Sequence, residues 1–394
     1  MPIGKSTSHE KRVKRRIIGR KHAFFAATSP RLNGICAEEL LSLELPIVKP
    51  SAVPGGVTFS GRLADCYAAN LHLRTATRIL MRIGTFKAVN FRQVEKAAGN
   101  FPWNLYLDPS CRIRLKASTS KCRLYHTDAI EHHFLSGMMH GSAAVDDHDG
   151  SGAEPLFDIY IRGENDCFTV SLDSSGTPLY KRGLKSHPAR APLRETLAAA
   201  ALRLAGYTGV RPLIDPMCGS GTISLEAAMT AAKIPAGWFR EFAFMDWPSF
   251  KPKLWEYMKK EARQRFQFPL SPVVFASDVD GHAVSALEKT VEKYGLSRII
   301  SVAHRDFFRS RPEAYTSQSG IVFLNPPYGI RLTDESKPLS FYRAVVDKLM
   351  RDYRNWTVVW VMPRENRFRG LPFSHTRHPI FHGGLELNLV IGTV

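Results

Sequence analysis

Long hydrophobic runs are missing from this chain of 394 residues. No apolar stretch approaches the roughly 18 residues that a transmembrane helix needs, so we expect no membrane association. Residues 1–21 are too basic and too poor in apolar side chains for a signal peptide. The sequence therefore predicts a cytoplasmic protein.

Cysteine is scarce, with six residues and no Cys-x-x-Cys pair. This spacing argues against a zinc cluster and against a disulfide framework, and we expect reduced thiols. Asp146, Asp147, His148 and Asp149 are adjacent in a glycine-rich stretch, 137–155, and adjacent ligands converge poorly on one ion. We therefore predict no bound metal, and we expect 137–155 to be a flexible surface loop.

Acidic residues are few relative to basic ones. There are 54 Lys and Arg against 36 Asp and Glu, a formal net charge of 54 − 36 = +18. Such an excess favours a polyanionic partner and is typical of nucleic-acid binding, although a solubilising surface is the alternative. The length permits two or three domains. Nothing in the residues indicates an oligomeric state.

One short stretch, 213–222, has the pattern of a strand, a glycine turn and a helix start. Leu213-Ile214-Asp215 ends a strand in a carboxylate, and a Gly-x-Gly turn follows. Glycines at 219 and 221 let the backbone approach a ligand at the carboxyl edge of an open α/β sheet. The third glycine of a dinucleotide fingerprint is replaced by Ser224, which disfavours nicotinamide or flavin cofactors.

A second signal follows 104 residues later (325 − 221 = 104), where a buried strand, 321–324, leads into Asn325-Pro326-Pro327-Tyr328-Gly329. The two prolines stiffen this loop. We expect them to hold the Asn325 amide and the Tyr328 ring at the ligand edge of the sheet.

Two further acids follow predicted strands between these signals. Asp278 could accept both hydroxyls of a ribose, and Asp306 could accept an amine from an adenine. Each could instead cap a helix. The distance from Asp215 to Asp278 is 278 − 215 = 63 residues, which we explain by an insertion over 238–268 that is rich in tryptophan. Asp215, Asp278 and Asp306 should then end three neighbouring strands.

The pair Asp-Pro-x-Cys-Gly-Ser-Gly and Asn-Pro-Pro-Tyr-Gly resembles S-adenosylmethionine-dependent methyltransferases that modify exocyclic amines of nucleobases. The insertion is similar to that of the bacterial large-subunit rRNA guanine-N2 methyltransferases. The resemblance implies a Rossmann-like class I methyltransferase sheet of the α/β class with S-adenosylmethionine as cofactor. It implies cofactor contacts at Asp215, Met217, Cys218, Gly219, Gly221, Thr222, Asp278, Asp306 and Phe307. It also implies a catalytic loop made of Asn325, Pro326, Pro327 and Tyr328.

The passage before the glycine turn, around Arg182 and 190–196, is also similar to this family. Covering the methionine end of the cofactor and a plain linker helix are both consistent with it. Cys218 is expected to pack against the cofactor, and a nucleophilic role is disfavoured.

The N-terminal part reads as an α+β region. Strands are predicted at 22–28, 57–59 and 85–89, and helices at 33–40 and 63–70. A strand at 111–117 alternates basic and apolar residues, and the stretch after it, ending in Lys121-Cys122-Arg123-Leu124-Tyr125-His126, resembles the THUMP RNA-binding module. Its RNA contacts would come from a basic and hydroxyl-bearing surface: Arg112, Arg114, Lys116, Ser118, Lys121 and Arg123.

These readings divide the chain into four segments. They are a basic disordered arm (1–21), a ferredoxin-like unit (22–74), a THUMP domain (75–175) and a methyltransferase domain (176–394). The arm could lie along phosphates or be an inert tail.

The predicted function is methylation of the N2 amine of a guanine, most consistent with 23S rRNA as partner. A THUMP-bearing tRNA guanine-N2 methyltransferase is the alternative within the class. DNA and protein-amide methyltransferases share the Asn-Pro-Pro-Tyr loop, and the loop chemistry alone serves adenine N6 as well. From another class, a non-catalytic RNA-binding or ribosome assembly factor stays open.

Overall fold

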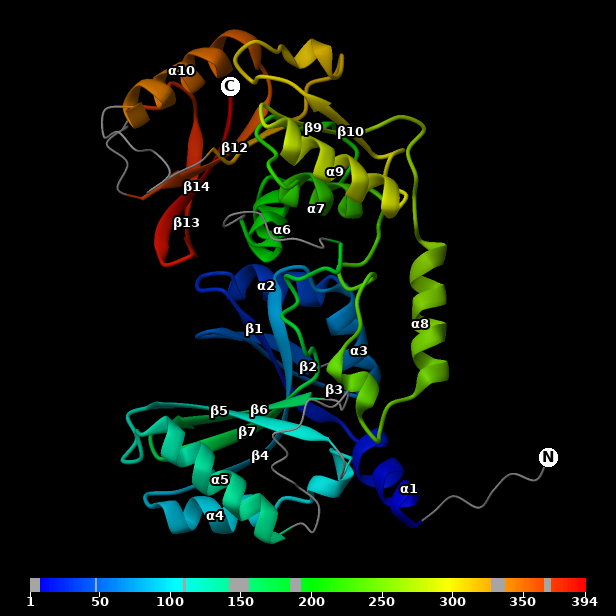
Figure 1. Ribbon diagram of the computed structural model, residues 1–394, viewed down its shortest axis with the longest axis vertical. Coiled ribbons are helices and arrows are strands. Elements are labelled where there is room, and N and C mark those ends of the chain that lie inside the picture. Colours follow the sequence, from blue (N-terminus) through cyan, green and yellow to red (C-terminus); the bar gives the residue numbers. More distant parts are fainter. Residues whose placement is uncertain are drawn as a thin grey trace, which may run out of the picture. The chain divides into compact units, whose positions relative to one another are not determined.

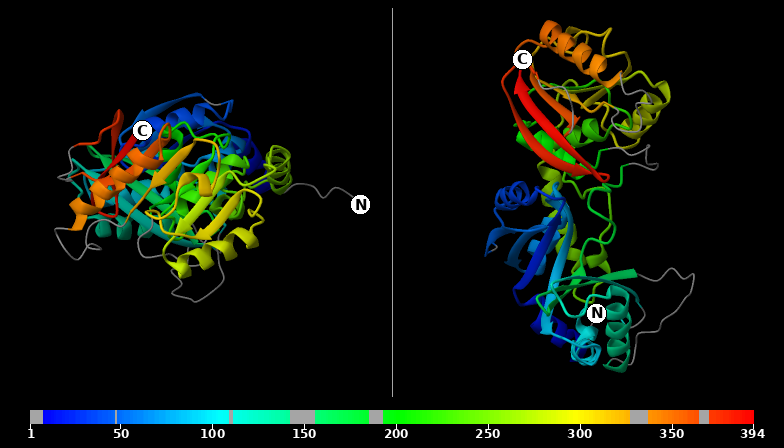
Figure 2. Two further views of the ribbon diagram at one scale, coloured as in Figure 1. Left: turned by 90° about the horizontal axis from the view of Figure 1, so that it is seen from above. Right: turned by 90° about the vertical axis from the view of Figure 1, so that its left-hand side faces the viewer.

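The computed structural model describes residues 8–46, 48–108, 111–141, 156–184, 193–326, 337–364 and 370–394. The chain forms two compact units. The first runs to Leu179 apart from Ser29–Ile35, and it also includes Arg240–Lys259. The remaining residues form the second unit. Each unit is built on a seven-stranded sheet (Figures 1 and 2).

The first sheet has the strand order β2-β3-β1-β4-β7-β6-β5, in which β5 and β6 are parallel and the other neighbouring strands are antiparallel. Its strands are β1 (His22–Thr28), β2 (Val48–Val53), β3 (Gly56–Gly61), β4 (Ala76–Lys87), β5 (Arg112–Ser120), β6 (Leu156–Glu164) and β7 (Cys167–Asp173). The long strand β4 pairs with β1 on one side and with β7 on the other. The predicted ferredoxin-like and THUMP segments therefore share one continuous sheet.

Alternating burial gives this sheet a helix-covered face. Phe157, Ile159 and Ile161 of β6 are buried on it, as are Phe168 and Val170 of β7. Two helices lie against this part of the sheet, α4 (Phe91–Gly99) and α5 (Thr127–Gly141), with the short 3₁₀ helix η2 (Trp103–Leu105) beside them (Figure 1). The helices α2 (Asn33–Leu41) and α3 (Leu63–His72) connect the strands of the other half.

Two sequence predictions about this unit are corrected. Residues predicted as a disordered arm form the helix α1 (Ser8–Val13) and the π-helix η1 (Lys14–Ile18), because Val13 and Ile17, one helical turn apart, are both buried. The expected loop 137–155 begins later than predicted, since α5 continues to Gly141. Residues 1–7 and 142–155, including the acidic run at 146–149, lie outside the described residues.

The predicted insertion belongs in part to the first unit. Arg240–Lys259 contains the 3₁₀ helix η3 (Ala243–Asp246) and the start of α8 (Pro252–Gln264). The Phe244 ring stacks on Tyr67 of α3 with centroids 4.3 Å apart, and Trp255 meets Tyr67 edge-on at 6.5 Å. The Arg240 guanidinium also donates to the carbonyl oxygens of Ser175, Thr177 and Pro178. Stacked aromatic rings and charge-assisted hydrogen bonds hold the segment there.

The second sheet has the order β10-β9-β8-β11-β12-β14-β13. Its first five strands are parallel, and a C-terminal antiparallel hairpin completes it. The strands are β8 (Leu213–Asp215), β9 (Val274–Asp278), β10 (Ile300–His304), β11 (Ile321–Leu324), β12 (Thr357–Pro363), β13 (His375–His382) and β14 (Leu385–Thr393).

Both faces of this sheet are buried, as is usual for parallel strands. One apolar cluster joins Leu213 and Phe323 to the helices α6 (Glu195–Leu204), α7 (Thr222–Ala231) and α9 (Gly281–Lys293). The other joins Ile214 and Val322 to α10 (Lys337–Asp352). A short 3₁₀ helix, η4 (Pro312–Ala314), follows β10. Within the described ranges, none of the helices has the length and apolar character needed to cross a membrane.

Candidate active site

The predicted site residues gather at one edge of the second sheet. Asp215 ends β8 and Asp278 ends β9, while Asp306 lies just beyond β10, and these three strands are neighbours. Asn325 follows β11, on the other side of β8. Because all four strands are parallel, their carboxyl ends meet at the edge where α/β sheets bind ligands. The predicted arrangement of the three acids on neighbouring strands is confirmed.

Backbone hydrogen bonds tie the glycine turn to β9. The Gly219 amide donates to Asp278 Oδ2 at 2.8 Å, and the Cys218 amide donates to the Ser277 carbonyl oxygen at 3.0 Å. Asp278 Oδ1 accepts from the Asp280 amide at 3.0 Å. The Asp278 carboxylate therefore orients both its own loop and the glycine turn.

The two glycines of the turn have different structural roles, one in helix packing and one at the ligand edge. Both have positive φ, +49° at Gly219 and +74° at Gly221. A Cβ at Gly221 would lie 2.3 Å from Leu287 Cδ1, whereas a Cβ at Gly219 would meet no atom within 4 Å. Gly221 therefore lets α7 pack close to α9, and Gly219 is the glycine that leaves open space at the ligand edge.

Asp215 is buried and holds the glycine turn in place through a hydrogen bond. Its side chain is completely buried, and its Oδ2 accepts a hydrogen bond of 2.7 Å from the Ser224 hydroxyl. Ser224, which replaces the third glycine of the dinucleotide pattern, thus fixes the first turn of α7 to the end of β8. In this conformation Asp215 positions the turn and exposes no surface to a ligand.

Around Asp306 the structure modifies one prediction. Asp306 Oδ1 accepts from the Phe308 amide at 2.8 Å, and the side chain is 37% exposed. Phe307, predicted to flank an adenine, is only 2% exposed and packs 6.0 Å from Tyr353 in the apolar cluster. Its neighbour Phe308 is 38% exposed and is the ring better placed to contact a ligand.

Asn325 carries a buried acceptor that no described residue uses. Its Oδ1 atom is buried and has no hydrogen-bond partner among the described residues. Pro326, next to it, is buried, whereas Pro327 and Tyr328 lie outside the described residues. Leaving a buried oxygen unsatisfied costs about 1–3 kcal/mol, so a polar ligand hydrogen is the expected partner.

The remaining residues of the turn favour binding over covalent chemistry. Burial, followed by the charges of Asp215 and Asp278, raises the pKa of the Cys218 thiol far above its usual range. A thiol that stays protonated is a poor nucleophile, in agreement with the packing role predicted for Cys218. Met217 is half-buried beside it, and Thr222 is the first residue of α7. Among the described residues, no cluster of His, Cys, Asp and Glu could hold a metal ion.

Three contacts near the site were not predicted from the sequence. The Ser277 and Tyr315 hydroxyls are 2.9 Å apart, and the Arg305 guanidinium lies 4.9 Å from the Tyr315 ring centroid. Arg182 Nε donates to Glu226 Oε1 of α7 at 2.7 Å in a buried ion pair. Glu226 is the one charged residue of α7, and this was the signal in the sequence for the pair.

The predicted RNA-binding residues lie in the first unit, on and after β5. Arg114 and Lys116 both make ion pairs of 2.6 Å with the buried carboxylate of Asp158. Ser118 and Lys121 are exposed and Arg112 is half-exposed. Arg123 is exposed and lies 3.7 Å from an Asp166 oxygen.

Comparison with known proteins places the chain in a family. The family model of the RMKL-like methyltransferase domain matches residues 182–370, and that of the RlmL ferredoxin-like domain matches residues 23–80. Over 379 residues the chain is 30% identical to "Putative RNA methyltransferase slr0064" of Synechocystis sp., a match that covers 93% of this chain and 95% of that relative. This chain belongs to the RMKL-like methyltransferase family.

Longer family members and a solved structure extend the comparison. The chain is 30% identical to "Ribosomal RNA large subunit methyltransferase K/L" of Methylococcus capsulatus over 93% of its own length and 50% of that relative. It thus spans about half the length of such relatives. A crystal structure of "SMU.472, a putative methyltransferase complexed with SAH" matches 94% of this chain and 98% of the other, with a TM-score of 0.82 and 24% identity, which shows the shared fold.

Membership of the RMKL-like family confirms the predicted fold class and reaction class. The chain is an S-adenosylmethionine-dependent methyltransferase. The site fits such a cofactor, since Gly219 leaves open space where a Cβ would stand and the Asp278 and Asp306 carboxylates adjoin it at the sheet edge.

Proposed function

We propose that this chain transfers the methyl group of S-adenosylmethionine to the exocyclic N2 amine of a guanine in large-subunit ribosomal RNA. The observation that carries the proposal is the buried Oδ1 of Asn325 at the end of β11, for which the described residues offer no hydrogen-bond partner. Relatives named as large subunit ribosomal RNA methyltransferases support the substrate.

Asn325 matches the chemical need of this acceptor. An exocyclic amine is a poor nucleophile because its lone pair is delocalised into the ring. Asn325 Oδ1 and the Pro326 carbonyl oxygen would accept its two hydrogens as the nitrogen becomes tetrahedral. Positive charge would then develop on a nitrogen held by these two oxygens, and their attraction to it would strengthen in the transition state. The methyl donor supplies an electrophilic carbon bound to a sulfonium. Tyr328 would stack on the flipped base, with Pro327 stiffening the loop.

The cofactor would lie over the glycine turn. We assign ribose contacts to Asp278 and an adenine contact to Asp306, with the ring of Phe308 or Phe307 beside it. The remaining contacts come from the turn itself, whose residues Met217, Cys218, Gly219, Gly221 and Thr222 surround the methionine part, while Asp215 fixes the turn from below.

RNA would be held by the first unit. We assign residues 75–175 as a THUMP domain and residues 22–74 as its ferredoxin-like companion, with phosphate and sugar contacts from Arg112, Arg114, Lys116, Ser118, Lys121 and Arg123. A cytoplasmic location follows from an RNA substrate of this kind.

Nucleoside mass spectrometry tests the reaction and the substrate together. Large-subunit rRNA and tRNA are compared between parental cells and cells that lack the gene. We expect N2-methylguanosine to disappear from the rRNA and to return with the wild-type gene, but not with Asn325→Ala. Asn104→Ala, at an exposed position of the first unit, serves as the matched control and should restore the methylation.

Other outcomes of this experiment select other functions. Loss of N2-methylguanosine from tRNA alone would favour the tRNA guanine-N2 methyltransferase, and loss of N6-methyladenosine would identify an adenine target. If no methylated base changes in either RNA, the catalytic proposal fails. A non-catalytic RNA-binding factor should also show no heat of binding with S-adenosylhomocysteine in calorimetry.

A further inference from the structure

The face of the first sheet opposite to α4 and α5, called here the open face, carries side chains from several strands. Side chains alternate between the faces of a strand, so Asp158, Tyr160 and Arg162 of β6 point away from its buried residues. The strand register places further residues on this face, in cross-strand rows. They are Phe25, Arg82, Thr169, Ser171, Arg114, Lys116 and Ser118.

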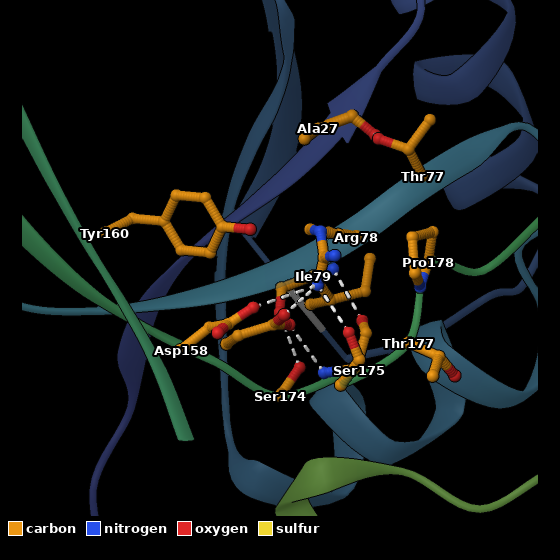
Figure 3. A network of polar contacts seen from close by, with 12 residues as sticks. Ala27, Thr77, Arg78, Ile79, Asp158, Tyr160, Ser174, Ser175, Thr177 and Pro178 are labelled. Atoms are coloured by element: carbon orange, nitrogen blue, oxygen red, sulfur yellow. Dashed lines mark hydrogen bonds and ion pairs between the residues drawn. The ribbon is translucent and has the colours of Figure 1, made fainter. Parts of the chain in front are cut away.

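Much of the positive charge on the open face is neutralised within the protein. The Asp158 carboxylate is 2.6 Å from both Arg114 and Lys116. It also lies 3.9 Å from the Arg78 guanidinium (Figure 3). Arg78 also pairs with the buried Asp173. Although burial acts to raise the pKa of Asp158, its hydrogen bonds from Arg114 and Lys116 hold that pKa below its usual range. These cations are therefore less available to an external anion.

Two arginines on the same face have no acidic partner in the part of the chain that the structure describes. Neither Arg82 nor Arg162 forms an ion pair with any described residue. Arg82 is half-buried and lies 5.2 Å from the Phe25 ring centroid, whereas Arg162 is exposed. Burial, and then the positive charge of Arg162, lowers the pKa of Arg82.

The register places the two arginines on the same face of the sheet, on either side of β7. On β7, Arg82 is opposite Ser171 from one side and Arg162 is opposite Thr169 from the other. Ser171 and Thr169 are two residues apart, so their side chains share a face. The two arginines thus flank β7, with a half-exposed Thr169 hydroxyl between them.

We propose that Arg82 and Arg162, with Thr169 between them, form a phosphate-binding site on the open face that takes the phosphodiester backbone of RNA. Two like charges on one face, neither neutralised by an acid among the described residues, favour an anion, and the planar guanidinium donors match phosphate oxygens. The proposal deepens the RNA-binding part of the proposed function and rests on it.

The aromatic rings indicate backbone recognition rather than base recognition. The Phe25 ring lies beside Arg82, and the Tyr160 ring has Lys116 at 5.2 Å and Arg78 at 5.8 Å from its centroid. Rings already paired with cations are not free to stack on bases. Binding at this site should therefore depend little on sequence and strongly on salt.

The experiment measures RNA affinity without catalysis. Fluorescence anisotropy follows binding of a fluorescein-labelled 30-nucleotide polyuridine, and of a mixed-sequence strand of equal length, across a series of salt concentrations. The variants are Arg162→Ala and Arg82→Ala/Arg162→Ala. Arg92→Ala/Lys96→Ala is the matched control, since it removes two exposed cations from α4 of the same unit. Urea denaturation followed by circular dichroism reports that every variant is folded.

We expect the double arginine variant to bind both strands at least about fivefold more weakly, and its slope of log affinity against log salt to fall by about one per arginine. The single variant Arg162→Ala, at an exposed position, should show about half of the double variant's decrease in the salt slope. Inorganic phosphate at millimolar concentration should compete with RNA for the parent more than for the double variant. Unchanged RNA affinity in folded variants would overturn the proposal, as would an equal loss in the control.

Two results separate this inference from the proposed function. If the parent binds RNA through the arginine pair but methylates no guanine, the site stands and the enzymatic proposal fails. If guanine methylation persists in the double variant with an unchanged KM for RNA, the site fails and the enzymatic proposal stands.

Discussion

Replacing each glycine of the turn by alanine should separate packing from ligand binding. Both positions have positive φ, so an alanine costs about 1–2 kcal/mol at either one. At Gly221 the new Cβ would also lie 2.3 Å from Leu287 Cδ1 and 2.9 Å from Cδ2. Overpacking of this kind adds about 1–3 kcal/mol. Because alanine restricts the unfolded chain more than glycine does, it stabilises the folded state of both variants by about 0.4–1 kcal/mol.

The expected loss of stability is therefore about 2–4 kcal/mol for Gly221→Ala and about 1 kcal/mol for Gly219→Ala. Ligand affinity should change in the opposite order. The Cβ at Gly219 projects into open space at the ligand edge, so Gly219→Ala should weaken S-adenosylhomocysteine binding at least about tenfold, the effect of roughly 1.4 kcal/mol.

Urea denaturation followed by circular dichroism gives the free energies of unfolding, and titration calorimetry gives the affinities. The reasoning is refuted if Gly219→Ala destabilises the fold as much as Gly221→Ala does. It is equally refuted if Gly219→Ala binds S-adenosylhomocysteine as tightly as the parent.

Two further predictions concern the first unit. Trp255→Ala should lower the free energy of unfolding by about 3–5 kcal/mol because a buried aromatic side chain is lost, whereas Tyr257→Ala, on the exposed side of the same helix, should change it little; equal effects in urea denaturation would contradict the packing of Arg240–Lys259. Burial raises the pKa of Asp173 to about 6, against the effect of Arg78. The folded state then binds the Asp173 proton more tightly than the unfolded state does. The contribution of Asp173 to the free energy of unfolding is therefore complete below about pH 4 and is lost as the pH rises through 6. The free energy of unfolding, measured from pH 4 to 7, should fall less with pH in Asp173→Asn than in the parent. If the two proteins give parallel curves, this prediction is wrong.

The second unit was largely predictable from its sequence. Its strands are short apolar runs that end in Asp215, Asp278 and the approach to Asp306, and parallel strands bring such ends together whatever lies between them. The sequence also indicated the need for glycine at 219 and 221. It did not distinguish their tasks, because the contact between Gly221 and Leu287 joins residues far apart in the chain.

The first unit was less predictable, for reasons of long-range pairing. The basic face of β5 was visible as alternation, yet its neutralisation by Asp158 depends on the register of β5 against β6, which no local pattern encodes. The helix at Ser8–Val13 was missed because only Val13 and Ile17 mark its buried side. The arginine pair was missed because Arg82 and Arg162 are 162 − 82 = 80 residues apart.

The course of the chain at Arg240–Lys259 limits how this protein can be dissected. A fragment that begins at Tyr180 would keep Phe244, Phe250 and Trp255 but lack Tyr67, against which all three rings lie. It would also keep Arg240 without the carbonyl oxygens that it binds. Neither half is therefore a natural unit for expression or for exchange between relatives, and a fusion that transplants the methyltransferase half should carry its N-terminal partner with it.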